Sequence, residues 1–190
     1  MSSRLFTWPM SSRETIMLGA FGPRWFERPW RVFPGFIDGS RATQWFFETL
    51  QLPSRRVTCG QAVSWAEHIL PEDSSLFDFF LRVPSMLGIE SCAQLLCWIS
   101  RYVDGEFINE HVDKAGDLQM ILCLQAPPRE HGGELRLEHG TERARFTLAP
   151  GDAVFFSATT VRHSTTPLRR SGSVPDPIRA VAVARFTWNS

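Results

Sequence analysis

Three side chains that could share one metal ion stand at positions 111, 113 and 163. His111 and Asp113 are two residues apart, and in extended backbone residues i and i+2 point to the same face. His163 follows in a separate segment rich in strand-forming residues. Two imidazoles and one carboxylate leave coordination positions open, which suits non-haem iron(II). The set contains no thiolate, which argues against a closed structural zinc site.

Two arginines, Arg179 and Arg185, frame an otherwise apolar stretch near the C-terminus. An arginine that faces the interior is costly to bury without an anion. A guanidinium group matches a carboxylate with two parallel hydrogen bonds. An inward-facing Arg179 therefore predicts a carboxylate-bearing ligand, and a surface position at the strand end is the alternative. Arg185 shares its strand face and could be a second anion contact, although a surface or structural role is an equal alternative.

The elements that must position these residues form an all-β pattern from about residue 94 onward. Short apolar runs are broken by turn signals at intervals of about 8–12 residues. Pro150-Gly151, for example, suits the two central positions of a type II turn. We expect strands at residues 94–103, 117–125, 134–138, 143–148, 153–157, 163–166 and 178–188. The predicted fold is mainly β, a sandwich or jelly roll backed by helices.

Two helices are expected before these strands. The first has Ser40 as its cap and one apolar face, formed by Ala42, Trp45, Phe46 and Thr49. The second begins near residue 73 or 74 and carries Leu76, Phe77, Phe80 and Leu81, and Pro84 should end or kink it. A short strand and turn is expected at residues 31–36. The first thirty residues, rich in Arg, Trp and Phe, predict an irregular arm or a flap.

Bulk properties favour one domain over residues 1–190, with an arm and helices at 1–93 and a β core at 94–190. A formal net charge of zero gives no electrostatic footprint for nucleic acid or an anionic membrane. The four cysteines match no CxxC metal pattern and predict reduced thiols in a cytoplasmic protein. Cys92 and Cys97 are expected to be buried and His131 and His139 solvated. His68 is expected to be a helix-surface or packed residue and not a ligand.

The ordered motifs resemble those of a known family. Residues 102–113 resemble the Tyr-x-x-Gly-x-x-x-x-x-His-x-Asp segment of prolyl 4-hydroxylase-like iron(II)/2-oxoglutarate-dependent oxygenases. The Gly132-Gly133 segment, the Pro150-Gly151 run, the segment from His163 to Pro167 and the strand from Arg179 are similar to later motifs of that family. The resemblance covers about residues 95–188.

The resemblance implies a double-stranded β-helix with Fe(II) held by His111, Asp113 and His163. It places the distal carboxylate of 2-oxoglutarate against Arg179. Gln119, Tyr102, Thr165 and Arg185 are further expected contacts of this cosubstrate, and ascorbate is expected to stimulate turnover. An apparent insertion at 169–177 lengthens the spacing between His163 and Arg179. Cys123 and Ile108 replace tyrosines that are frequent in the family.

The implied reaction uses O2 to hydroxylate a substrate C–H bond and releases succinate and CO2. The carboxylate of Asp113 predicts hydroxylation, desaturation or cyclisation, and not halogenation. We expect a free amino acid or another biosynthetic metabolite as substrate. Residues 25–30, 127–131 and 169–177 are candidates to line its pocket, with surface loops and core anchors as the more common role of any one residue. The alternatives are a peptidyl, prolyl-type hydroxylase, an alkylation-repair demethylase and a non-catalytic cupin-like metal-binding protein. Arg179 and Arg185 have the demethylase spacing, but Val181 and Val183 replace its Asn and Thr.

Overall fold

The computed structural model describes residues 28–59, 63–89, 92–171 and 176–188. Most of the expected N-terminal arm, and the middle of the loop at 169–177, lie outside the described residues. The elements in chain order are β1 (Trp30–Phe33), α2 (Gly39–Thr49), β2 (Ser54–Cys59), β3 (Val63–Ile69), α3 (Ser75–Met86), β4 (Gln94–Tyr102), β5 (Leu118–Gln125), the 3-10 turn η2 (Arg129–His131), β6 (Leu135–His139), β7 (Glu142–Phe146), β8 (Ala153–Phe156), β9 (Arg162–Thr165) and β10 (Arg179–Thr187).

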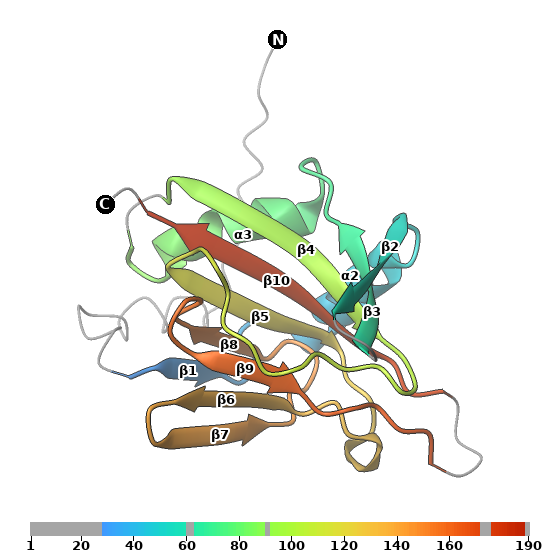
Figure 1. Ribbon diagram of the computed structural model, residues 1–190. Coiled ribbons are helices and arrows are strands. Elements are labelled where there is room, and N and C mark those ends of the chain that lie inside the picture. Colours follow the sequence, from blue (N-terminus) through green and yellow to red (C-terminus); the bar gives the residue numbers. More distant parts are fainter. Residues whose placement is uncertain (1–27, 60–62, 90–91, 172–175, 189–190) are drawn as a thin grey trace.

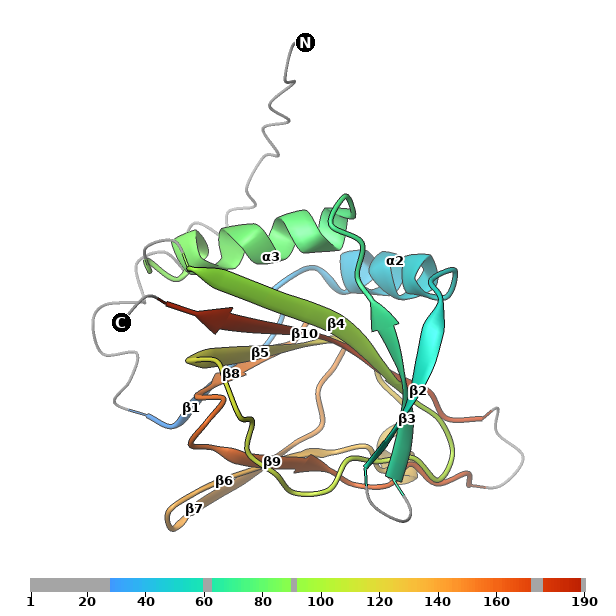
Figure 2. The ribbon, with the colours of Figure 1, turned by 45° about the horizontal axis from the view of Figure 1, so that its top comes forward.

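Two antiparallel sheets face each other across the interior (Figure 1). The major sheet has seven strands in the order β1-β8-β5-β10-β4-β3-β2, and the minor sheet has the order β7-β6-β9. Figure 2 shows the helices α2 and α3 over the outer face of the major sheet, with the minor sheet on the opposite side. The expected double-stranded β-helix, or jelly roll, with supporting helices is confirmed.

Helix α2 buries the apolar face that its sequence predicts, formed by Ala42, Trp45, Phe46 and Thr49. Its cap lies slightly earlier in the chain than expected. The Asp38 side chain accepts a hydrogen bond from the Ser40 amide at 2.8 Å, so Asp38 and not Ser40 is the N-cap. A carboxylate at this position satisfies an amide that has no partner within the helix.

Helix α3 begins as expected, with Ser74 capping the amide of Phe77 at 3.2 Å. The prediction that Pro84 ends or kinks it was wrong about the boundary, because the helix continues to Met86. Pro84 stands in the last turn, where the proline removes only one hydrogen bond. The buried face also differs from the prediction, because Leu81 is 52% exposed while Phe79 and Val83 are buried.

The alternation of β10 separates two cores. Ala180, Ala182 and Ala184 belong to the core between the major sheet and the helices. Val181 and Val183 belong to the core between the two sheets. Because strand side chains alternate, Arg179 and Arg185 share the face of Val181 and Val183 and point toward the barrel interior. The strand therefore delivers both arginines to the space between the sheets.

The segment before residue 94 contributes three strands to the major sheet. Strand β1 corresponds to the short strand expected at residues 31–36, whereas β2 and β3 were not predicted. His68 is packed, one of its two expected roles, but it lies on strand β3 and not on a helix, with its Nδ1 3.1 Å from the carbonyl of Leu52. His131, expected to be solvated, is 1% exposed, and its Nδ1 donates to the carbonyl of Arg169 at 2.8 Å. The prediction for His131 was wrong because the sequence does not show the tertiary partner of a polar residue in a loop. Cys92 and Cys97 are partly exposed rather than buried.

Among the described residues, no helix has both the length and the apolar character that crossing a membrane requires.

Candidate metal centre

The backbone pairs the two histidines directly. The His111 amide donates to the His163 carbonyl at 3.1 Å, and the His163 amide donates to the His111 carbonyl at 2.9 Å. Strand β9 carries His163, whereas His111 lies outside any regular strand and forms an isolated bridge. Residues 111–113 form no regular strand, and this bridge is their pairing with β9. Asp113 is held by its own amide, which donates to the carbonyl of Ala158 at 3.0 Å.

The three side chains converge as the spacing predicts. One ligand atom from each of His111, Asp113 and His163 lies within 4.8 Å of the others. The Asp113 carboxylate oxygens are 3.9 Å from Nε2 of His111 and 3.6 Å from Nε2 of His163. The Oδ2 atom of Asp113 is buried and has no hydrogen-bond partner among the described residues, which suits an oxygen that binds a cation.

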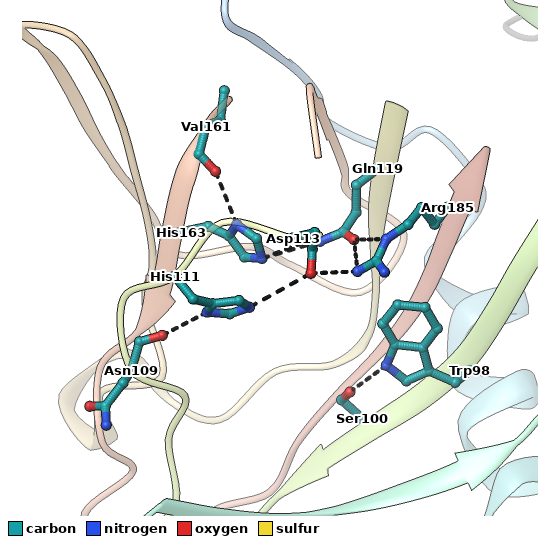
Figure 3. A network of polar contacts seen from close by, with 9 residues as sticks. All are labelled: Trp98, Ser100, Asn109, His111, Asp113, Gln119, Val161, His163 and Arg185. Carbon is teal, nitrogen blue, oxygen red and sulfur yellow. Dashed lines mark hydrogen bonds and ion pairs between the residues drawn. The ribbon is translucent and has the colours of Figure 1, made fainter. Parts of the chain in front are cut away.

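Backbone carbonyls fix the tautomer of both imidazoles. Nδ1 of His111 lies 2.8 Å from the Asn109 carbonyl, and Nδ1 of His163 lies 3.2 Å from the Val161 carbonyl (Figure 3). A carbonyl can only accept, so each Nδ1 carries the proton and each Nε2 offers a lone pair. This arrangement, in which the second ring nitrogen is hydrogen-bonded, is the usual support for a metal-binding histidine.

Arg185 ties the carboxylate to the barrel wall. Its Nη2 is 2.6 Å from Oδ1 of Asp113, and its Nε and Nη2 donate to Oε1 of Gln119 at 3.1 and 2.9 Å. The Gln119 amide nitrogen in turn lies 3.3 Å from Nε2 of His163, and the guanidinium group stacks over Trp98 (Figure 3). Arg185 therefore already has a carboxylate partner within the chain. The sequence had left the role of Arg185 open between a contact to an anion and a structural contact.

Gly116 is a site residue that sequence reasoning missed. Its φ is +96°, and a Cβ there would lie 2.3 Å from Cγ and 2.4 Å from Cδ of Arg185. Only a residue without a side chain lets Arg185 pass this point toward Asp113. Gly116 follows the His-x-Asp motif closely, but a loop glycine most often serves only the turn that its backbone makes, so the sequence did not single it out.

Gly116→Ala should therefore displace Arg185 and leave Asp113 without its partner. We expect a roughly tenfold to hundredfold loss of Fe(II) affinity, the size seen when groups that orient a ligand are lost. Calorimetric titration with Fe(II) under anaerobic conditions measures it. Gly140→Ala is the matched control, because Gly140 also has a positive φ but a Cβ there meets nothing within 4 Å. Equal metal affinity in the two variants would contradict this role of Gly116.

The buried position of His163 favours its neutral form. Burial is the main cause that lowers the pKa of His163 to about 4, with a smaller lowering by His111, while Asp113 acts in the opposite direction. In the unfolded chain the same group titrates near its ordinary value of about 6.5. A neutral imidazole at physiological pH is the form that binds a metal.

The metal-free protein should consequently lose stability as the pH falls from about 6.5 to about 4. In that pH range His163 is protonated in the unfolded chain but stays neutral in the folded protein. The unfolding free energy therefore drops by up to about 1.4 kcal/mol per pH unit. Urea unfolding at several pH values measures the slope. His68, whose pKa burial also lowers, adds to the same trend. His163→Gln should flatten the slope in part, and an unchanged slope would contradict the assignment.

Arg179 lies at the opposite end of the same interior face. It is 5% exposed, its guanidinium carbon is 5.1 Å from the centre of the Tyr102 ring, and its Nη1 has no hydrogen-bond partner among the described residues. No carboxylate in the described part of the chain pairs with it. A buried guanidinium group in this state needs an anion, as its sequence position suggested.

The Gly132-Gly133 pair makes room for Arg179. Gly133 has a φ of +75°, and a Cβ there would lie 2.8 Å from Cδ2 of Leu168 and 3.2 Å from Cδ of Arg179. A small pocket beside Arg179 is also lined by Cys123, Pro127 and Leu148. Burial raises the pKa of the Cys123 thiol to about 12, so this wall of the pocket stays neutral.

The other predicted cosubstrate contacts are placed as follows. Tyr102 is buried opposite Arg179 on β4, and burial raises the pKa of its phenol. Gln119 is buried between Arg185 and His163. The hydroxyl of Thr165 accepts the Ile108 amide at 3.0 Å, which anchors the segment that leads to His111. Tyr102 thus lies beside Arg179, while Gln119 lies beside the three candidate ligands.

The donor set fits the metal that the family implies. Two neutral imidazoles and a carboxylate on one side of a point are the ligands of the two-His, one-carboxylate class, which leaves positions open for other ligands. A double-stranded β-helix with this set between its sheets is the arrangement expected of a jelly-roll protein that binds a non-haem metal.

Comparisons with known proteins name the family. Residues 97–187 match the model of the 2OG-Fe(II) oxygenase superfamily. A PKHD-type hydroxylase from Burkholderia lata is 36% identical over 89 residues, which are 40% of this chain and 38% of that protein. The chain spans about two fifths of the length of the curated relatives it matches. Residues 97–187 are therefore similar in sequence to the 2OG-Fe(II) oxygenase superfamily and to PKHD-type hydroxylases.

Solved structures share the fold. A prolyl-4-hydroxylase from Pseudomonas putida superposes with a TM-score of 0.71 at 17% identity, over 91% of this chain and 100% of that one. A prolyl hydroxylase from Trichoplax adhaerens, solved with a peptide fragment of the hypoxia inducible factor oxygen degradation domain, gives 0.71 at 11% identity, over 92% and 90%. At these identities the likeness concerns the fold.

Proposed function

We propose that this protein is an Fe(II)- and 2-oxoglutarate-dependent dioxygenase that hydroxylates a C–H bond of a small molecule, an amino acid or a biosynthetic metabolite. His111, Asp113 and His163 would hold the metal. When bound, iron with 2-oxoglutarate supplies the oxidising chemistry that consumes O2 and yields succinate and CO2. A cytoplasmic location and stimulation by ascorbate are parts of the same proposal.

The protein's own residues would bind the cosubstrate, orient the metal ligands and shield the reacting centre from water. Arg179 would hold the distal carboxylate of the cosubstrate, and Tyr102 packs against its guanidinium group. Arg185 would keep Asp113 oriented, with Gln119 bridging toward His163. Val181, Val183 and Ile121 supply an apolar wall between the two ends, which excludes water from the reacting centre.

One observation carries the proposal: a buried arginine without a carboxylate partner shares an interior face with a His-Asp-His cluster. Arg179 and Arg185 are six residues apart, about 20 Å along a strand. Because Arg185 is already paired with Asp113, the guanidinium group of Arg179 is the one of the two that lacks a carboxylate within the described chain. A carboxylate cosubstrate would supply the anion that Arg179 lacks, whereas a bound metal ion alone would not.

The test combines a spectrum with a screen. Anaerobic Fe(II) plus 2-oxoglutarate should give a weak visible charge-transfer band, which a cupin-like binding protein would not give. Succinate formation is then followed with Fe(II), ascorbate and O2, first over free amino acids and biosynthetic metabolites. The absence of both the band and substrate-dependent succinate would overturn the proposal.

A peptidyl, prolyl-type hydroxylase is the second candidate, because the fold is shared with prolyl hydroxylases, one of them solved with a peptide. We favour a small substrate since the large groove lined by Arg136 and Arg145 does not include the three candidate ligands. Proline-containing peptides form the second arm of the succinate screen, and methylated DNA, the substrate of a demethylase, forms the third. The arm that stimulates succinate release assigns the substrate class.

A further inference from the structure

The outer face of the minor sheet carries a groove that the metal centre does not use. His163 and Thr165 of β9 are buried toward the interior, so the alternate residues Arg162 and Ser164 point away from the major sheet. Figure 2 shows this face of β6, β7 and β9 on the side opposite to the helices. The groove has a volume of about 670 Å³, and its lining includes Phe107, Glu110, Arg136, Arg145, Ser164 and Pro167.

One row of charges across this face is neutralised. Glu138 is in register with Arg143 on one side and Arg162 on the other. Arg143 pairs with Glu138 at 3.2 Å, and Arg162 pairs with Glu110 at 3.3 Å. The row therefore alternates positive and negative groups from β7 to the segment before His111, and it carries no net charge.

The next row lacks this compensation. Arg136 stands directly opposite Arg145 on β7 and opposite Ser164 on β9. Both arginines are exposed, and neither makes a hydrogen bond or ion pair with any residue of the described ranges. Like charges directly opposite one another on paired strands destabilise a sheet. The fold thus tolerates two unpaired cations side by side on the floor of a groove.

We propose that this groove binds an acidic segment of a partner polypeptide, whose carboxylates lie between Arg136 and Arg145. Guanidinium groups bind carboxylates bidentately, and two anions would relieve the repulsion between the two arginines. The groove crosses four adjacent backbone segments, about 14 Å at the usual strand spacing. That width accommodates about four residues of extended chain.

The remaining lining favours a polypeptide over a nucleic acid. Glu138 and Glu110 border the two arginines and would repel a continuous run of phosphates. The whole chain has a formal net charge of zero, without the positive excess that nucleic-acid binding uses. Phe107 and Pro167 at one side of the groove offer contacts to an apolar side chain next to the acidic ones.

Arg145→Glu is the sharpest test, because it should weaken binding of an acidic peptide without lowering the thermal stability of the protein. The new carboxylate would face Arg136 across the strands, so the melting temperature should stay the same or rise. The probe is a fluorescein-labelled ten-residue peptide of alternating glutamate and leucine, followed by anisotropy with the full chain. The wild type should bind it, and the variant should bind at least about tenfold more weakly.

Arg55→Glu is the matched control. It makes the same charge change at an arginine that pairs with Glu67, far along the sheet order from β6 and β7. This variant should bind the peptide as the wild type does. The assay needs neither iron nor 2-oxoglutarate, so its outcome is independent of the proposed oxygenase activity.

Three results would overturn the inference. The first is equal weakening in the Arg55→Glu and Arg145→Glu variants, which would mean that only overall charge matters. The second is equal binding of a lysine–leucine peptide of the same length. The third is tighter binding of a ten-nucleotide oligothymidylate than of the acidic peptide, which would assign the groove to nucleic acid.

Discussion

Asp113→Ala is expected to lower the affinity for Fe(II) at least about a hundredfold and to reduce substrate-dependent succinate formation to background. The change removes one of three candidate ligands, and nothing else in the described chain replaces it, because Gln119 is already engaged by Arg185. It also leaves the guanidinium group of Arg185 without its carboxylate. Anaerobic Fe(II) titration and a coupled succinate assay measure the two effects.

Asp117→Ala is the matched control for this prediction. Asp117 lies four residues further on and accepts the Trp188 amide at 2.8 Å, so its loss removes a hydrogen bond but no candidate ligand. A destabilisation of about 1 kcal/mol is expected, with metal affinity unchanged. Full activity of the Asp113→Ala protein would show that the three side chains are not the metal site.

Arg179→Gln is expected to raise the KM for 2-oxoglutarate by about a hundredfold or more, while Fe(II) binding stays intact. Breaking a buried ion pair by removing one partner costs about 3–5 kcal/mol, which corresponds to that factor or more. The thermal stability of the ligand-free protein, by contrast, should not fall with this substitution. Because Arg179 lacks a carboxylate partner in the described chain, its removal should leave the melting temperature unchanged or raise it.

The thermal shift caused by 2-oxoglutarate separates this role from a structural one. A ligand that binds only the folded state raises its stability, so the wild type should melt at a higher temperature when the cosubstrate is added. Arg179→Gln should lose that increase. Arg101→Gln is the control, because Arg101 stands in register with Ala180, the neighbour of Arg179, on the other face of the sheet. An undiminished shift in Arg179→Gln would reject the assignment.

Much of the fold follows from alternation and turn residues. The strands after residue 94 were predicted within one or two residues, because apolar runs such as β5 stand between clear turn signals. The turn at Pro150-Gly151 formed as expected, with Gly151 at a φ of +94° and the Asp152 amide donating to the Ala149 carbonyl. Strands β2 and β3 escaped prediction since Arg, Ser and Glu interrupt their apolar residues.

The sequence predicted which residues form the candidate site, but not which side chains contact one another there. The spacing of His111 and Asp113 indicated convergence, and the apolar surroundings of Arg179 indicated burial. The ion pair between Arg185 and Asp113 depends on a loop that turns at Gly116, and no periodicity encodes the path of a loop. His131 shows the same limit, because its burial depends on a carbonyl 38 positions away.

The reciprocal bridge between residues 111 and 163 has a consequence for how such a protein can change. Main-chain groups align the two imidazoles, whose ring centres are 4.1 Å apart, so substitution of a neighbouring side chain does not dismantle the pair. A descendant without the carboxylate would retain two nitrogen donors on one side of the same point. The main chain therefore preserves half of a chelating site through changes that replace the remaining donor.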